Sequence, residues 1–280
     1  MALRRSQIKR SAGIACCRFN GDRYEVLLIR KRYSHAFAAF VFGQYNANSS
    51  QHLIKLFSGM TTAEKLDILS MDFNILWYRI WLKFPGRVPA EEYSRDNWLQ
   101  IYKKKTLLNH IHEKPARSMC ELYVLKKAKY ESSFLVDNGG RLMSLMRRAK
   151  KSKDALWEIP KGRVMAGEST IECAIREFEE ETGASRKMVN LVCDAAAFVD
   201  EIKDMGVTYR STYYAGIANT VFEPSIDISS ATQMVEVDRV NWVSVNELRF
   251  LNVAPTTRRH LGHILKVVKN RYKSYKASLP

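Results

Sequence analysis

The sequence predicts an α/β fold that is interrupted by a mainly helical insertion. Three observations along the 280 residues support this prediction. Strand-like apolar runs occur near the N-terminus, apolar residues at helical spacing follow, and strand-like runs return after Lys153. We therefore expect one α/β domain built from residues 1–33 and 152–280, with a basic helical insertion at residues 34–151 between its two parts.

The N-terminal runs predict a β-hairpin. Apolar residues cluster at positions 13–19 and 24–29, and Asn20-Gly21 separates the two clusters. This dipeptide favours the positive φ angles of a tight hairpin turn. The first two strands of the sheet are therefore expected to be antiparallel neighbours.

The insertion has the spacing of several helices. Residues 61–64 (TTAE) form a capping-box sequence, and apolar residues continue at helical spacing until Pro85. A further helix is expected to begin after Ser94, and another to carry the apolar residues at 142–146. Lysine and arginine clusters accompany these helices.

The remaining elements of the α/β domain are expected after Lys153. A short strand at 156–159 ends at Pro160, and a helix follows at 169–182. The other expected elements are strands at 191–199, 208–218 and 236–243 and a basic C-terminal helix at 255–275.

The charge balance points to a polyanionic partner. Lysine and arginine number 45 and aspartate and glutamate 29, so the formal net charge is 45 − 29 = +16. Such an excess favours nucleic acid ahead of an acidic membrane surface, with a merely solvated basic surface as the alternative.

Composition also excludes several classes of protein. Apolar runs fall short of the ~20 residues that span a bilayer, and the N-terminus lacks the apolar core of a secretory signal. The five cysteines have no CxxC spacing, which argues against a disulfide framework or a zinc finger. We therefore expect a cytoplasmic protein without a transmembrane segment and with reduced thiols.

One acidic cluster has the pattern of a metal site. Glu177, Glu180 and Glu181 are spaced i, i+3 and i+4, so on a helix their carboxylates are neighbours. Like charges this close repel one another unless a cation neutralises them, and hard divalent cations prefer oxygen ligands. Gly162 would let the loop backbone approach the ion, and Gly183 would end the helix. A solvated glutamate-rich helix is the alternative.

The opposite face of this helix would anchor it to a sheet. Its apolar residues are Ile171, Ala174, Ile175 and Phe178.

The complete pattern at residues 162–184 resembles the Nudix box. The fixed glycine and charged positions of that box are occupied by Gly162, Glu168, Arg176, Glu177, Glu180, Glu181 and Gly183. The resemblance implies a Nudix α/β/α sandwich and metal-dependent hydrolysis of a phosphoanhydride. It also implies the metal ligands for Mg²⁺ or Mn²⁺, which would be Glu177, Glu180, Glu181 and the Gly162 carbonyl. Glu168 and Arg176 would form a structural ion pair.

Two positions outside the box complete the expected site. The Glu and Trp spacing at 236–242 resembles the mRNA-decapping branch of the family, which implies Glu236 as general base. Asp238 and Glu201 are weaker alternatives. Lys161 belongs to a Trp-x-x-Pro-Lys-Gly segment that resembles the same branch, and its cation could meet a substrate phosphate. A solvated loop lysine is the alternative.

Segments along nearly the whole chain resemble viral mRNA-decapping enzymes of the African swine fever virus type. They include residues 31–37, 52–55, 77–81, 97–99 and 173–183. This resemblance implies a viral protein that removes the 5′ cap of mRNA in the host cytoplasm, which would shut off host expression. The products would be 7-methyl-GDP and 5′-monophosphate RNA.

The basic insertion is expected to bind the RNA backbone. The favoured contacts are Arg147, Arg148, Lys150 and Lys151, and solvated helix residues are the alternative. The aromatic that stacks on the cap base stays open among Phe37, Tyr209, Tyr213 and Tyr214.

Two other functions stay open at this point. The same viral relatives are credited with hydrolysing diphosphoinositol polyphosphates, which a basic cleft would also attract. A non-catalytic RNA-binding protein on a Nudix scaffold is the third possibility. The sequence does not fix the oligomeric state.

Overall fold

The computed structural model describes residues 7–21, 23–81, 113–150, 154–192, 198–204, 207–227, 230, 233 and 236–277. The helix expected after Ser94 and the residue Lys151 lie outside these ranges. The chain divides into two compact units. The first unit is Met1–Arg32 with Leu156–Pro280, and the second is Tyr33–Ala155.

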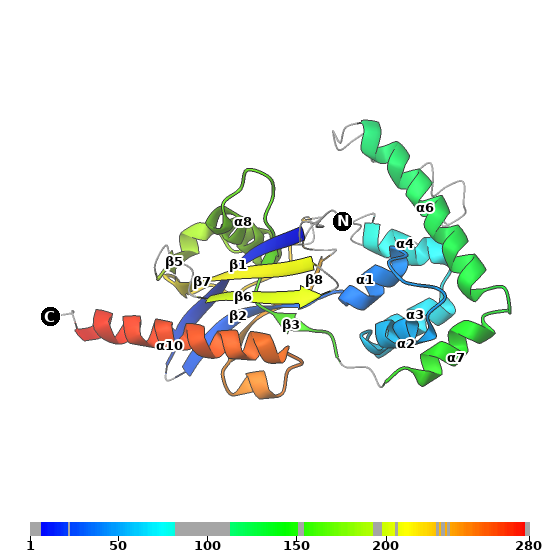
Figure 1. Ribbon diagram of the computed structural model, residues 1–280. Helices are drawn as coiled ribbons and strands as arrows, with labels where there is room; N and C mark the ends of the chain where they lie inside the picture. Colours follow the sequence, from blue (N-terminus) through cyan, green and yellow to red (C-terminus); the bar gives the residue numbers. More distant parts are fainter. Residues whose placement is uncertain are drawn as a thin grey trace, which may run out of the picture. The chain divides into compact units, whose positions relative to one another are not determined.

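The first unit is built on a mixed sheet, which has eight strands among the described residues (Figure 1). The order along the main path is β3-β2-β1-β7-β5, while β4 pairs with β1, β6 with β7 and β8 with β2. The strands are β1 (Gln7–Asn20), β2 (Arg23–Lys31), β3 (Trp157–Glu158), β4 (Lys161–Arg163), β5 (Val189–Leu191), β6 (Phe198–Asp204), β7 (Val207–Ala218) and β8 (Val237–Ser244).

Two pairings fix the centre of this sheet. The predicted hairpin is confirmed, because Asn20 pairs with Arg23 and Gly21 has a φ of +64° in the turn. On its other side β1 runs parallel to β7, from Gln7 opposite Val207 to Cys17 opposite Ile217. Strands that are 200 positions apart in sequence, as are Gln7 and Val207, therefore lie next to each other.

Helices cover both faces of the sheet, as an α/β fold requires. Figure 1 shows α8 (Thr170–Thr182) on one face and α10 (Pro255–Ala277) on the other. Phe178 of α8 belongs to the buried cluster that includes Ile14 and Leu27, while Ile264 of α10 belongs to the cluster on the opposite face that includes Leu28. Short 3-10 helices occur at Arg186–Met188 and Glu247–Arg249.

The second unit is helical in its described part. Its helices are α1 (His35–Val41), α2 (Ser50–Ser58), α3 (Thr62–Ser70), α4 (Phe73–Trp81), α6 (Glu113–Phe134) and α7 (Gly140–Arg148). The capping box at 61–64 is present, and it begins α3. Over residues 61–81 the helical spacing belongs to two helices, because Met71 takes an extended conformation between α3 and α4. The end of the run expected at Pro85 lies outside the described residues.

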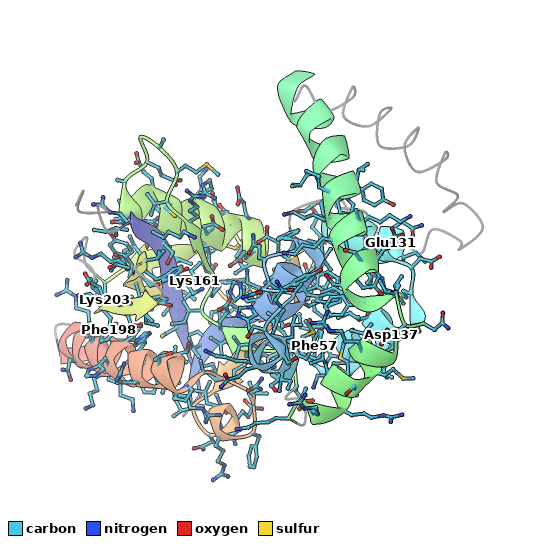
Figure 2. All side chains as sticks on the ribbon, turned by 45° about the vertical axis from the view of Figure 1, so that its right-hand side comes forward. Phe57, Glu131, Asp137, Lys161, Phe198 and Lys203 are labelled. Carbon is cyan, nitrogen blue, oxygen red and sulfur yellow. The ribbon has the colours of Figure 1, made fainter. Side chains whose placement is uncertain are left out.

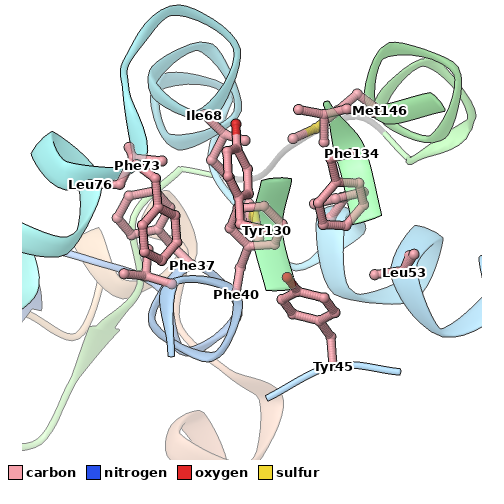
Figure 3. Close-up of a cluster of buried hydrophobic side chains, with 14 of the residues drawn as sticks. Phe37, Phe40, Tyr45, Leu53, Ile68, Phe73, Leu76, Tyr130, Phe134 and Met146 are labelled. Atoms are coloured by element: carbon pink, nitrogen blue, oxygen red, sulfur yellow. The ribbon is translucent and has the colours of Figure 1, made fainter. Parts of the chain in front are cut away.

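Aromatic side chains fill the core of this helical unit. Figure 2 places Phe57 inside it and Glu131 and Asp137 at its surface. Phe40 lies at the centre of the close-up in Figure 3, with ring centroids 5.5 Å from Phe134 and 5.9 Å from Tyr130. Such pairs add to the burial free energy of each ring. Among the described residues, no helix is both long and apolar enough to cross a bilayer.

Candidate active site

The acidic helix α8 is defined by local signals at both ends. Ser169 caps its first turn and forms a reciprocal capping box with Glu172. Gly183 ends the helix with a φ of +69°, a left-handed conformation that glycine adopts without a steric penalty. These signals set the residues at which the helix begins and ends.

The glutamates of α8 are not simply solvated. Glu181 is 1% exposed and Glu177 is 8% exposed, whereas the Glu180 side chain is about two-fifths exposed at 39%. Charged side chains are buried this deeply only when partners compensate them. The alternative of a solvated surface helix therefore fits Glu180 but neither of the other two residues.

Gly162 lies directly against the Glu177 carboxylate. A Cβ atom at position 162 would lie 2.0 Å from the carboxyl carbon of Glu177. Any side chain here would displace that carboxylate. The Gly162 carbonyl accepts a hydrogen bond from the Cys173 thiol of α8 at 3.5 Å, so β4 and α8 are joined at this point.

Arg176 donates hydrogen bonds to three carboxylates, two of which belong to α8. Its Nε donates to Glu168 at 2.8 Å, and its Nη1 donates to Glu177 at 2.6 Å and to Glu180 at 3.1 Å. The Arg176 hydrogen bonds, together with the Met165 amide, lower the pKa of Glu168 to about 2. Glu168 therefore stays ionised and holds the box loop on its helix.

Glu181 has a partner on each carboxylate oxygen. Lys31, at the end of β2, donates to Oε1, and the Lys161 amide of β4 donates to Oε2 at 2.8 Å. Burial raises the pKa of Glu181 to about 7, and the repulsion of Glu158 adds to this shift while Lys31 opposes it. Burial also raises the pKa of Glu177, against the attraction of Arg176.

Lys31 connects this helix to two further carboxylates. Its Nζ lies 3.7 Å from Glu236 and 3.8 Å from the buried Glu158. The Lys161 Nζ lies 3.3 Å from the other oxygen of Glu158. Glu236 thus lies at the cluster, and Lys161 is held by a carboxylate beside it.

Sequence reasoning missed Lys31 and Glu158. Both are charged residues in or at the end of apolar strand segments, and that position is the signal that could have identified them.

The donor set of this cluster fits a hard divalent cation. The contacts above involve six carboxylates (Glu158, Glu168, Glu177, Glu180, Glu181 and Glu236) and three cations (Lys31, Lys161 and Arg176), a formal balance of 3 − 6 = −3 when all of them are ionised. Oxygen donors with excess negative charge are what Mg²⁺ and Mn²⁺ prefer. Within the described ranges no three acidic, thiol or imidazole side chains already form a cage for an ion.

The other predicted residues lie elsewhere. Asp238 accepts from Arg30 of the neighbouring strand at 2.7 Å, and Glu201 pairs with Arg210 across β6 and β7. Arg147, Arg148 and Lys150 are exposed at the end of α7, in the helical unit.

Exposure separates the four candidate stacking aromatics. Phe37 is fully buried, and Tyr213 and Tyr214 are each 4% exposed. Tyr209 is 39% exposed, and the Lys9 ammonium lies 5.4 Å from its ring centroid. Tyr209 is thus the one of these four rings that a ligand could reach.

Comparisons with known proteins identify the class. The protein-family model described as the NUDIX domain matches residues 132–264. The chain is 34% identical to the mRNA-decapping protein g5R of African swine fever virus isolate Pig/Kenya/KEN-50/1950, over 95% of this chain and 99% of that protein. It is 32% identical to the same protein of strain Badajoz 1971 Vero-adapted, over 95% and 98% respectively.

The chain belongs to the Nudix hydrolase family, and it is a phosphoanhydride hydrolase. Within the family, its resemblance to the decapping proteins of African swine fever virus is confirmed. Among solved structures it is similar to an Ap4A hydrolase of C. elegans, with a TM-score of 0.40 and 10% identity over 97% of this chain and 99% of that chain.

Proposed function

We propose that the protein removes the 5′ cap from mRNA by hydrolysing the triphosphate bridge, with Mg²⁺ or Mn²⁺ as cofactor. The products would be 7-methyl-GDP and 5′-monophosphate RNA. The observation that carries the proposal is the buried carboxylate cluster of α8, in a chain that aligns along 99% of a decapping protein. The site would act in the host cytoplasm.

Five residues of the site have a proposed role in catalysis. Glu177, Glu180, Glu181 and the Gly162 carbonyl would hold the cation, which supplies charge neutralisation for the bridging phosphates when bound. Glu236 would accept a proton on its carboxylate from the attacking water, because its side chain is 43% exposed at the edge of the cluster. The water oxygen adds to phosphorus as the bond to the leaving phosphate breaks.

Two surfaces would bind the rest of the substrate. On the helical unit, Arg147, Arg148 and Lys150 are exposed, and Lys65 donates to the carbonyl of Lys150 at 2.9 Å. This patch, with Lys151 next in sequence, suits a phosphate backbone. On the α/β unit, Tyr209 offers an exposed ring for a cationic methylated base. The Lys161 ammonium, which lies beside Glu158, would bind a phosphate of the substrate.

The test uses RNA that is labelled in the cap phosphates, with Mn²⁺ present. We expect the natural protein to release 7-methyl-GDP and Glu181→Gln to lower turnover by about 100-fold or more, since a ligand charge is lost. The exposed Glu179 of the same helix gives the matched control, and Glu179→Gln should retain activity.

The result also separates the alternatives. Release of phosphate from diphosphoinositol polyphosphates but no nucleotide from capped RNA would replace decapping with that activity. RNA binding without any hydrolysis would overturn the enzymatic proposal.

A further inference from the structure

Lys31 has an unusual environment for a lysine of a strand end. Its side chain is 21% exposed, and its Nζ contacts three carboxylates that come from three different segments. Glu181 belongs to α8, Glu158 to β3 and Glu236 to the residue before β8. Without a positive charge between them, these carboxylates would repel one another.

Glu181 cannot gain a cation without changing this arrangement. Its Oε2 accepts from the Lys161 amide, which is fixed in β4 by the pairing of Gly13 with Lys161. Its Oε1 is held by the Lys31 ammonium. A divalent ion on Glu181 would therefore lie at contact distance from a like charge, and charges at about 4 Å interact strongly inside a protein.

Arg176 differs from Lys31 in its freedom to move. The Arg176 guanidinium also donates to both oxygens of Glu168 and to the Arg163 carbonyl at 3.1 Å. These groups, which are not among the proposed metal ligands, hold it in place. In the described part of the chain, the polar contacts of the Lys31 side chain are the three carboxylates themselves. The flexible Lys31 side chain can move when the charge around these carboxylates changes.

We propose that Lys31 is a built-in counter-cation, which gathers Glu158, Glu181 and Glu236 in the metal-free protein and is displaced from Glu181 when the divalent ion binds. The inference rests on the metal site of the proposed function, and it adds a competitor for that site. Lys31 is a positioning residue, because it acts through the carboxylates. Its presence lowers metal affinity and maintains the folded site until metal arrives.

The first experiment compares Mn²⁺ binding by Lys31→Met and by the natural full-length chain. Free Mn²⁺ is measured by electron paramagnetic resonance, without RNA. Because the variant lacks the competing charge, we expect it to bind Mn²⁺ about tenfold more tightly or better, while Lys31→Arg stays close to the natural protein. The matched control is Lys203→Met, which removes an exposed lysine of β6 away from Lys161 (Figure 2) and should stay within about twofold.

The same proteins give a stability readout. The metal-free Lys31→Met protein should melt at a lower temperature than Lys203→Met, because buried carboxylates lose their partner. Saturating Mn²⁺ should raise its melting temperature more than that of the natural chain. Equal or weaker Mn²⁺ binding by folded Lys31→Met would overturn the inference.

A second measurement needs no variant, so it decides the question even if Lys31→Met does not fold. The natural protein is treated with an amine-reactive reagent with and without Mn²⁺, and labelled peptides are quantified by mass spectrometry. Labelling of Lys31 relative to Lys203 should rise with Mn²⁺, since the ammonium leaves the carboxylates. An unchanged ratio would contradict displacement.

These outcomes distinguish the two proposals. If the natural protein binds no Mn²⁺, the metal site of the proposed function and the role of Lys31 both fail. If it binds Mn²⁺ and Lys31 neither competes nor changes its labelling, only the inference about Lys31 fails.

Discussion

The two units of this chain bury different kinds of side chain. The α/β unit buries the carboxylates of Glu158, Glu177 and Glu181, whereas the core of the helical unit is mainly aromatic and aliphatic. Buried ion pairs contribute little net stability, while packed aromatic rings contribute several kcal/mol each. The difference teaches that the α/β unit adds a buried set of carboxylates to its apolar clusters, whereas the helical unit relies on its aromatic and aliphatic core.

The buried acid of the helical unit supports this distinction. Glu64 is 4% exposed, and its carboxylate accepts from the Thr61 amide at 2.8 Å and from the Ser34 hydroxyl at 2.8 Å. It joins the caps of α1 and α3, so its negative charge is satisfied locally. Burial alone therefore does not identify a catalytic carboxylate; the site in the α/β unit differs by having several carboxylates close to one another.

The largest effect on turnover should come from Gly162→Ala, which tests the carboxylate cluster of the α/β unit. The new methyl group would force the Glu177 carboxylate away, and a displacement of about 1 Å in a catalytic group can cost about 100-fold in rate. Turnover of capped RNA at saturating Mn²⁺ measures the loss, with circular dichroism to verify folding. The control is Gly262→Ala in α10, where a Cβ atom would meet no atom within 4 Å. Full activity of Gly162→Ala would remove Glu177 from the site.

An effect of a different kind, on stability and less on turnover, is expected from Phe134→Ala in the helical unit. Phe134 is fully buried and lies 5.5 Å from Phe40 and 5.6 Å from Tyr45 between ring centroids. Its truncation should cost about 3–5 kcal/mol of unfolding free energy, measured with urea. RNA affinity should fall, while hydrolysis of a cap dinucleotide continues. Val136→Ala, at an 82% exposed position, is the control. Equal loss of dinucleotide hydrolysis would contradict the division between the units.

The smallest effect is expected from Glu168→Gln, in the way that protein stability changes as the pH falls. The pKa of Glu168 in the folded protein is lowered to about 2 from an ordinary 4.5, so its stabilising contribution is present above pH 4.5 and is lost as the pH falls towards 2. The stability difference between the natural chain and Glu168→Gln should therefore shrink over this range. Metal-free protein is unfolded with urea at each pH. A difference that stays constant would show that the Arg176 contact does not set the pKa.

Local signals predicted the parts of the fold that depend on neighbours in sequence. The hairpin turn at Asn20-Gly21 and the capped helix α8 are both where the sequence places them. The boundary between α3 and α4 was harder, because apolar spacing continues through Met71 while the backbone there is extended. The spacing of apolar residues does not reveal a break in the helix as short as this one.

The site was only partly predictable for a related reason. The glutamates of α8 are close in sequence, so their spacing predicts that they are neighbours. Lys31 and Glu181 are 150 positions apart, and only the sheet brings them together. Likewise the four candidate aromatics look alike in sequence, and the exposure of Tyr209 follows from its place on the sheet.

The parallel pairing of β1 with β7 has a consequence for synthesis on the ribosome. Ser11 and Ser211 share a hydrogen bond of 2.9 Å across this pair, so the first strand meets its neighbour only after 200 further residues have been made. The whole helical unit, which ends at Ala155, emerges before β7 does. Domains fold largely as units during translation. The inserted unit should therefore fold first, and the apolar residues of the nascent β1–β2 hairpin, such as Ile14 and Leu28, stay uncovered until β7 is made.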